Sequence, residues 1–164
     1  MIIKNARRTA VALALVAVSA VAAQAQTATQ TVNFAVNAIN QVSVSAASTT
    51  LTITTAVAGS APTSVNSAGL TWAVTTNQST AKITGSIGTP MPAGLTLSAT
   101  LGAPAGATSA GYKVLSAVAV DLVTVVTKVA QAGMALTYQL DATPAAGVVG
   151  ASSTLVTYTI TGGT

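Results

Sequence analysis

Hydrophobic and polar residues alternate in short runs along most of the chain. A period of two places the apolar side chains on one face of a β-strand, so that this face can pack against a core. Stretches rich in Gly, Pro, Ser and Asn separate the runs and are typical of turns. The expected strands are defined by Val32, Phe34 and Val36; Val42 and Val44; Leu51 and Ile53; Leu70, Trp72 and Val74; Ile83 and Ile87; Leu95, Leu97, Ala99 and Leu101; Leu136, Tyr138 and Leu140; and Val156, Tyr158 and Ile160.

The stretch Tyr112–Ala132 has a less regular pattern. The residues from 114 to 120 and from 125 to 129 suit strands, and we expect Asp121 to cap a short helical turn between them. Gly85 lies between the apolar positions Ile83 and Ile87, where it indicates a bulge or a site of close packing. No amphipathic helix of useful length is predicted anywhere.

About seven to nine short strands without intervening helices predict an all-β fold, an antiparallel β-sandwich of the immunoglobulin-like or jelly-roll-like kind. The residues expected in its core are Trp72, Leu97, Leu136, Tyr138 and Tyr158. Thr and Ser occupy the solvent-facing positions where soluble sandwiches usually carry charged residues. Charges on edge strands discourage association between sheets, so a chain that lacks them either risks association or uses it.

The start of the chain has the organisation of an export signal. Basic residues up to Arg8 precede the uncharged, mostly apolar stretch Thr9–Ala23, and Ala23-Gln24-Ala25 is a small-x-small cleavage site. The apolar stretch is shorter than the roughly 20 residues that a membrane-spanning helix needs. We therefore predict cleavage after Ala25, no membrane span in the mature form, and passage through the periplasm to the cell surface or the medium.

These features divide the chain into three parts. Residues 1–25 are the predicted signal peptide, residues 26–37 an N-terminal strand or donor segment, and residues 38–164 a β-sandwich domain. The mature chain keeps three lysines and two aspartates, a net charge of about +1. It has no basic patch for neutralising phosphates, and nucleic-acid binding is not expected.

The composition excludes most catalytic chemistry. Charged residues make up 5% of the chain, against roughly 25% in ordinary globular proteins, and there is no Cys, His or Glu. Without His or Cys the chain cannot form a Ser-His-Asp or Cys-His constellation or the usual zinc site. Two carboxylates alone make a poor cage for a hard cation. We predict that the protein is not an enzyme and holds no metal or cofactor.

Two chemical roles are considered for the few charged residues, each beside a simpler structural interpretation. Asp121 and Asp141 resemble the carboxylate pair of a glycosidase, but a helical-turn cap and a turn before Pro144 explain them more simply. Lys82, Lys113 and Lys128 include candidates for an isopeptide bond to Asn or Asp, and solubilising surface lysines are the simpler explanation.

Two further positions carry a possible binding role. Trp72 suits a ligand platform, although a core position on an alternating strand is the simpler interpretation. Asn77-Gln78-Ser79 matches the glycosylation sequon, and a polar turn explains it equally well.

The segment Gln26–Asn37, here called the N-terminal segment, carries the main hypothesis about function. It is either the first strand of its own sandwich or a strand that adds to the sheet of a neighbouring subunit through Val32, Phe34 and Val36. Strand addition between identical subunits gives a head-to-tail contact that does not close, and hence a filament.

The chain also resembles bacterial fimbrial or surface-fibre subunits. The resemblance rests on the signal peptide, the Thr-, Ala-, Val- and Gly-rich composition, the early alternating strand, the stretches Met91–Leu97 and Thr137–Leu140, and the strand Thr157–Thr161. It implies a secreted structural subunit that self-associates into fibres or a surface layer. The chain lacks the cysteine pair and the penultimate aromatic residue of chaperone–usher pilins. A monomeric secreted β-sandwich that binds or adheres to an unknown ligand is the alternative.

Overall fold

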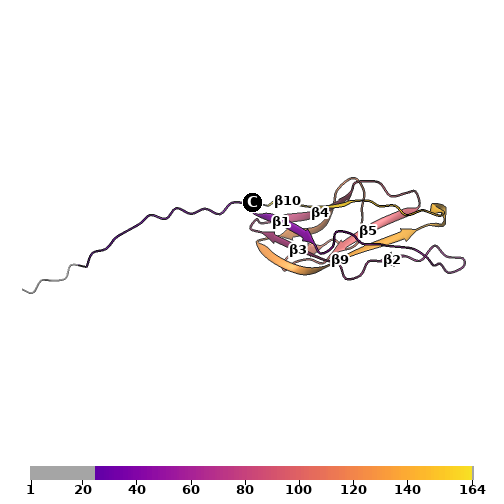
Figure 1. The fold of residues 1–164 in the computed structure, drawn as a ribbon, viewed down its shortest axis with the longest axis horizontal. Coiled ribbons are helices and arrows are strands. Elements are labelled where there is room, and N and C mark those ends of the chain that lie inside the picture. The colour runs from indigo at the N-terminus through magenta and orange to yellow at the C-terminus, as the bar shows by residue number, and fades with distance from the viewer. Residues whose placement is uncertain (1–24, 164) are drawn as a thin grey trace, which may run out of the picture. The chain divides into compact units, whose positions relative to one another are not determined.

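The computed structural model of the protein describes residues 25–163. Residues 1–24 of the predicted signal peptide lie outside the described residues, as does Thr164. The chain divides into two units, the first ending at Ala35 and the second beginning at Val36. The described part of the first unit, residues 25–35, forms no helix and no strand (Figure 1).

The second unit contains ten strands and one short 3₁₀ helix among its described residues. They are, in chain order, β1 (Asn40–Val44), β2 (Val65–Asn66), β3 (Thr71–Thr76), β4 (Ala81–Ile87), β5 (Leu95–Leu101), β6 (Thr108–Ser109), β7 (Lys113–Val114), β8 (Val120–Val126), β9 (Val129–Ala142), the 3₁₀ helix η1 (Pro144–Ala146) and β10 (Val156–Thr161).

The strands form two antiparallel sheets (Figure 1). The first has the order β1-β3-β9-β5-β7, with β2 also paired with β9, and the second has the order β10-β4-β8-β6. The predicted all-β antiparallel sandwich is therefore confirmed. The described residues form ten strands, where seven to nine were expected. The strands β2, β6 and β7 have only two residues each, which is too short for an alternating pattern to be visible.

The long strand β9 is the central strand of the first sheet and pairs with both β3 and β5. Its first half pairs with β3 up to Ala135, and its second half, Leu136–Ala142, pairs with β5. Gly133 adopts a φ of 71°, a left-handed conformation that glycine tolerates without steric cost, within the half that pairs with β3. The second half of β9 thus extends the sheet beyond the end of β3.

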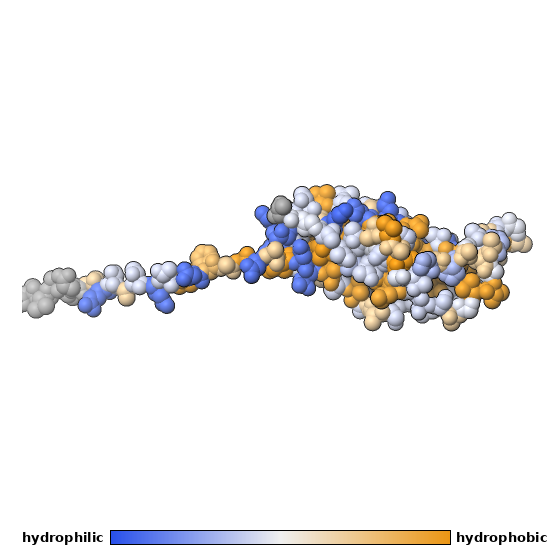
Figure 2. All heavy atoms as spheres, turned by 90° about the horizontal axis from the view of Figure 1, so that it is seen from above, coloured by the Kyte–Doolittle hydropathy of each residue, from blue (hydrophilic) through white to orange (hydrophobic). Residues whose placement is uncertain are grey.

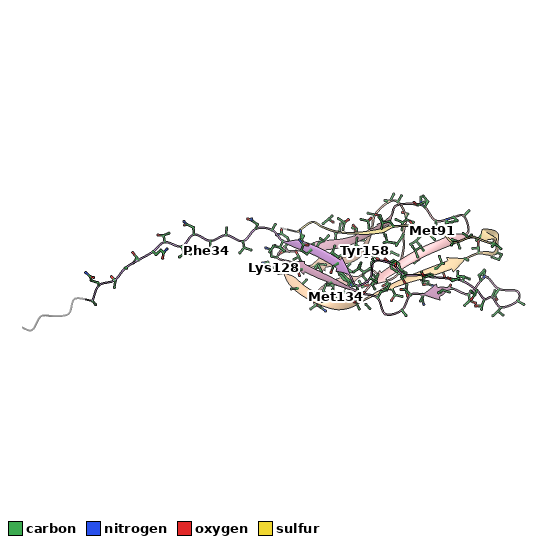
Figure 3. All side chains as sticks on the ribbon, in the orientation of Figure 1. Phe34, Met91, Lys128, Met134 and Tyr158 are labelled. Carbon is green, nitrogen blue, oxygen red and sulfur yellow. The ribbon has the colours of Figure 1, made fainter. Side chains whose placement is uncertain are left out.

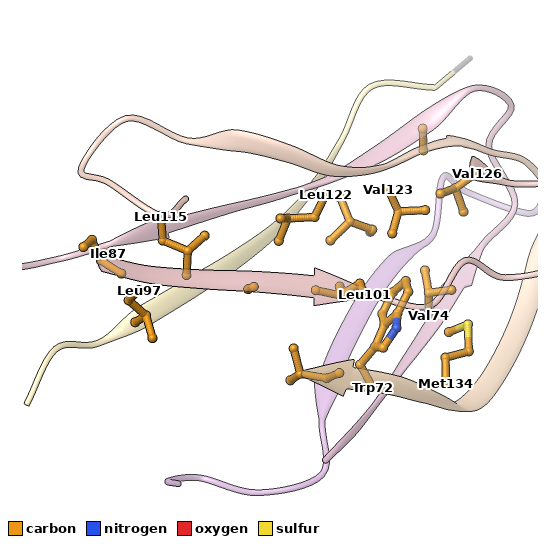
Figure 4. Close-up of a cluster of buried hydrophobic side chains, with 14 residues drawn as sticks. Trp72, Val74, Ile87, Leu97, Leu101, Leu115, Leu122, Val123, Val126 and Met134 are labelled. Atoms are coloured by element: carbon orange, nitrogen blue, oxygen red, sulfur yellow. The ribbon is translucent and has the colours of Figure 1, made fainter. Parts of the chain in front are cut away.

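The hydrophobic core lies between the two sheets and draws on β3, β4, β5, β8 and β9 (Figure 4). Trp72, Leu97 and Leu136 are buried as predicted, whereas Tyr138 and Tyr158 are half-buried and pack against the core. Trp72 is only 1% exposed. Its indole N–H donates to the carbonyl of Gly102 at 3.1 Å, which satisfies the polar atom that a buried tryptophan brings into a core.

Gly85 permits close packing between β4 and the core. A Cβ atom at this position would lie 2.6 Å from Cδ1 of Leu122 and 3.3 Å from Cδ2 of Leu115. The pairing of β4 with β8 also shifts its register between Ile83 and Thr84. Both sequence interpretations of Gly85, close packing and an irregular strand, therefore apply to this part of β4.

Several local predictions are wrong. The stretch 114–120 is not one strand, since residues 115–119 separate β7 from β8, and the stretch 125–129 includes the turn between β8 and β9. The alternating run Thr31–Asn37 forms no strand, and neither does Thr50–Thr54. The latter leads only to the isolated bridge between Ala56 and Pro62, where the proline has no N–H with which to continue a ladder. Asp121 does not cap a helical turn, because it lies inside β8, where its carboxylate forms an ion pair with Lys82 of β4.

Charge is scarce on the outer surface of the sandwich. Figure 2 shows few strongly hydrophilic residues on the visible face, among many of near-neutral hydropathy and scattered hydrophobic ones. On β10 the outward positions are Thr157, Thr159 and Thr161, so this edge strand carries no charge. The edge therefore lacks the charged side chains that protect edge strands from pairing with another chain.

Candidate functional site

The N-terminal segment exposes its apolar side chains to solvent. Val32, Phe34 and Val36 are 71%, 93% and 80% exposed, and residues 25–39 contain no helix or strand (Figure 3). Each of these side chains gains about 1.5–3 kcal/mol when it is buried, so their exposure leaves that free energy unused. The segment is free of charge throughout, from Gln26 to Asn37.

The side chain of Asn77 holds the chain at the point where the N-terminal segment meets the sandwich. Its Nδ2 donates to the carbonyl of Asn37 at 2.8 Å, and its Oδ1 accepts from the N–H of Ile39 at 2.8 Å. The N–H of Asn77 also donates to the carbonyl of Ile39 at 3.2 Å. The amide of the predicted sequon is thus engaged by backbone, as the polar-turn interpretation requires, and fixes residues 37–39 beside the first residue of β1.

A groove of about 570 Å³ opens at the other end of β1, on the side of the sandwich where both sheets end. One wall is the chain from Val44 to Thr49, and the other runs from Ser152 into β10 as far as Tyr158. The floor consists of side chains in or next to the first sheet, and Met91 with its flanking prolines also lines the groove. The floor residues are Leu70, Leu97, Leu136, Tyr138 and Leu140.

The groove, called the edge groove below, was not predicted from the sequence. Its lining comes from five separate parts of the chain, and no single part has an unusual pattern. Every residue that lines it is uncharged. Leu97 and Leu136 at its floor belong to the hydrophobic core, whereas Leu70 and Leu140 are half-exposed. The edge groove is therefore a place where the inner face of the first sheet is incompletely covered.

Two tyrosines join the sheets at the edge groove. The hydroxyl of Tyr158 in β10 donates to the hydroxyl of Tyr138 in β9 at 2.7 Å. Burial raises the pKa of Tyr158, and the hydrogen bond that its own proton makes raises this pKa further. Burial also raises the pKa of Tyr138, against a smaller lowering by the bond that it accepts. Both hydroxyls are therefore neutral at physiological pH and serve as a bridge between the sheets.

The two carboxylates lie on different sheets and have separate partners. Asp121 in β8 forms an ion pair with Nζ of Lys82 at 3.0 Å, and both side chains are nearly half exposed. Asp141 in β9 accepts hydrogen bonds from Ser64 Oγ and from Gln139 Nε2. The structure thus gives each aspartate a structural contact and places them in separate sheets.

The three lysines among the described residues are exposed, as expected for solubilising residues. Lys82 pairs with Asp121 on the surface, where solvent can hydrate the ammonium group. Lys113 lies in the edge strand β7, and Lys128 lies in the turn between β8 and β9, where its N–H donates to the carbonyl of Gln78. Their side chains stand in solvent, whereas Trp72, the candidate ligand platform, is part of the core.

Comparison of the chain with protein-family models, with curated proteins and with solved structures finds no significant match. Within residues 25–163, no helix is long and apolar enough to cross a membrane. The same residues contain no group of three or more metal-ligating side chains. The exposed apolar segment and the edge groove are the two features on which the functional interpretation rests.

Proposed function

We propose that this protein is an exported structural subunit that self-associates into extracellular fibres or a surface layer by β-strand addition. The N-terminal segment is the donated strand, and Val32, Phe34 and Val36 are the residues that bury themselves in the neighbouring subunit. The subunit needs no catalytic residue, cofactor or metal for this role. The single observation that carries the proposal is the exposure of these three side chains on an alternating, uncharged segment.

The sandwich supports the proposal because its two sheets form without the N-terminal segment. The first strand of the fold is β1, which starts at Asn40, after the segment has ended. An intramolecular role as the first strand would place Val32, Phe34 and Val36 against the core, whereas these side chains are exposed. A terminal segment is also the easiest strand to donate, since few internal contacts must break.

The proposal is tested by placing the same charge on the two faces of the N-terminal segment. Phe34→Asp puts a carboxylate among the side chains that are to be buried, and an unpaired charge there is strongly unfavourable. Asn33→Asp, one residue earlier, puts the same carboxylate on the opposite face of the strand. We expect the mature protein and Asn33→Asp to form large assemblies in sedimentation velocity and electron microscopy, and Phe34→Asp to stay monomeric.

Equal assembly of both variants would show that the apolar face of the segment is not used. A mature protein that stays monomeric at high concentration would contradict self-association altogether. The export part of the proposal has its own readout, since mass spectrometry of the secreted protein should find Gln26 at the N-terminus.

A monomeric binding module is the second candidate function, and the edge groove favours it. Its volume of about 570 Å³ lies within the range of roughly 300–1,000 Å³ that small-molecule sites usually have. Its apolar floor and the hydroxyl groups of its walls suit an uncharged ligand with a few polar groups. A monomeric protein that takes up such a ligand would support this function in place of the first.

A further inference from the structure

We infer that the edge groove is the acceptor site for the N-terminal segment of a second copy of this chain, which adds to the free edge of β10. This inference rests on the proposed function and names the surface that receives the donated strand. The occupant is the stretch from Gln30 to Val36, with Val32, Phe34 and Val36 directed to the groove floor. The assignment follows from the shape of the groove, the backbone groups along it, the reach of the chain and the distribution of charge.

The edge groove has the form that an added strand requires. β1 and β10 are edge strands of different sheets and lie beside each other. Beyond Val44 the chain after β1 and the chain before β10 become the two walls of the groove. The floor between them, with Leu70 and Leu140 half-exposed, is sheet surface that lacks a covering strand. A strand with three apolar side chains on one face would complete the core there.

The backbone of β10 presents free hydrogen-bonding groups to the groove side. Gly88 N–H donates to the carbonyl of Leu155 at 2.9 Å, so the hydrogen-bonded pairs with β4 fall at Leu155 and every second residue after it. The intervening residues, Val156, Tyr158 and Ile160, direct their N–H and C=O groups away from β4. Among the described residues no strand pairs with that edge. Of these, Val156 and Tyr158 line the groove, so an incoming strand can bond to these two residues of β10.

The length of the chain assigns the groove to a second copy. The groove begins at Val44, one full length of β1 away from Ile39, where Asn77 holds the backbone. Five residues of strand span about 16 Å. Phe34 lies five residues before Ile39 and can reach at most about 17 Å from it, even fully extended. To occupy its own groove the chain would have to turn back along β1, and Phe34 would still reach only the near end.

The edge groove and the N-terminal segment are electrostatically compatible. Neither the side chains that line the groove nor those from Gln26 to Asn37 carry a charge, so no charged side chain has to be desolvated when they meet. The outward positions of β10 and the alternate positions of the segment, such as Thr31 and Asn33, are polar and stay in solvent. The two strands therefore match face for face.

The site is tested by photo-crosslinking in the full mature chain. Phe34 is replaced by a benzoylphenylalanine, and unlabelled and ¹⁵N-labelled proteins are mixed so that mass spectrometry separates crosslinks between copies from those within one copy. We expect mixed-isotope crosslinks to the stretches 44–51 and 152–158. Crosslinks between copies that fall on β6 or β7, at the other edges of the sheets, would overturn the inference and leave strand addition intact. Crosslinks only within one copy would overturn both.

A groove-filling variant gives an independent measurement. Ala47 is exposed in one wall of the groove, and Ala117 is exposed in the connection between β7 and β8, outside the groove. Ala47→Trp should reduce the assembled fraction at least tenfold at a fixed concentration, and Ala117→Trp should assemble like the mature protein. Normal assembly of both variants would overturn the acceptor site while self-association stands. If no protein assembles and the groove instead takes up an apolar fluorescent dye, the proposed function fails as well.

Discussion

Two segments of this chain have almost the same pattern, and only one of them is a strand. Val32, Phe34 and Val36 recur at every second position near the start of the described residues, as Val156, Tyr158 and Ile160 do near their end. The latter form β10, hydrogen-bonded to β4 and packed against the core, whereas the former have no secondary structure. Alternation thus defines the two faces of a potential strand, and a free sheet edge has to supply the partner.

The largest expected effect comes from removing the core on which β10 depends. Trp72→Ala should lower the free energy of unfolding by about 3–5 kcal/mol, because it deletes a large, fully buried side chain and leaves a cavity. Urea denaturation followed by circular dichroism measures this loss. Hydrogen exchange should show lost protection in β10 and no change in the N-terminal segment. A loss below about 1 kcal/mol would contradict the core role of Trp72.

A smaller loss of folding stability is expected when a larger side chain is placed in β4, the strand that pairs with β10. Gly85 pairs with Tyr158, and a side chain at this position meets the buried Leu122. Gly85→Val should therefore cost about 1–3 kcal/mol of folding stability, as overpacked cores do. Gly88→Ala is the matched control, since its Cβ would meet only the carbonyl of Leu155 at 3.9 Å. Equal stability of the two variants would show that the core yields easily at Leu122.

The bridge between the sheets predicts a loss of stability in alkali. Burial raises the pKa of Tyr158, so as the pH rises through about 10 the unfolded chain releases its proton while the folded chain keeps it. The folded state then binds more protons, and the free energy of unfolding falls with pH. Between pH 9 and 11 the mature protein should lose about 1 kcal/mol more than Tyr158→Phe in chemical denaturation. Identical alkaline slopes would contradict this assignment.

The smallest effect on folding stability is expected from a substitution in the N-terminal segment. Phe34→Asp should change the unfolding free energy of the dilute monomer by less than about 0.5 kcal/mol, because an exposed side chain outside the core contributes little. Denaturation at low concentration measures it. A large loss would mean that the segment is a strand of its own sandwich, which would remove the difference between the two segments.

Alternation in the sequence predicted the strands that pair with a neighbouring strand over many residues. The stretch Leu95–Leu101 is β5 with the expected bounds, and the runs around Trp72 and Tyr158 are β3 and β10. The two-residue strands were missed because so short a run has no period. Thr50–Thr54 also alternates, but it lies beyond the point where β1 stops pairing with β3. Among the described residues, no long strand pairs with it.

The donor side of the proposed site could be predicted, whereas the acceptor side could not. Val32, Phe34 and Val36 are neighbours in the sequence, so their pattern is visible there. The edge groove depends on which strands are left at the edges, and its lining residues lie up to 114 positions apart, from Val44 to Tyr158. Such an arrangement follows from strand order, which local sequence patterns do not encode.

In the proposed fibre, the opposite placement of the Asn77 contact and the edge groove along β1 would make the two tips chemically different. One tip would end in an empty groove and the other in a bare segment, so each type of defective subunit would block growth at only one of them. Phe34→Asp subunits would still accept a neighbour and would cap one tip, while Ala47→Trp subunits would cap the other. Added in trace amounts to normal subunits, the two act as chain terminators of opposite polarity, and together they would set the length of the fibre.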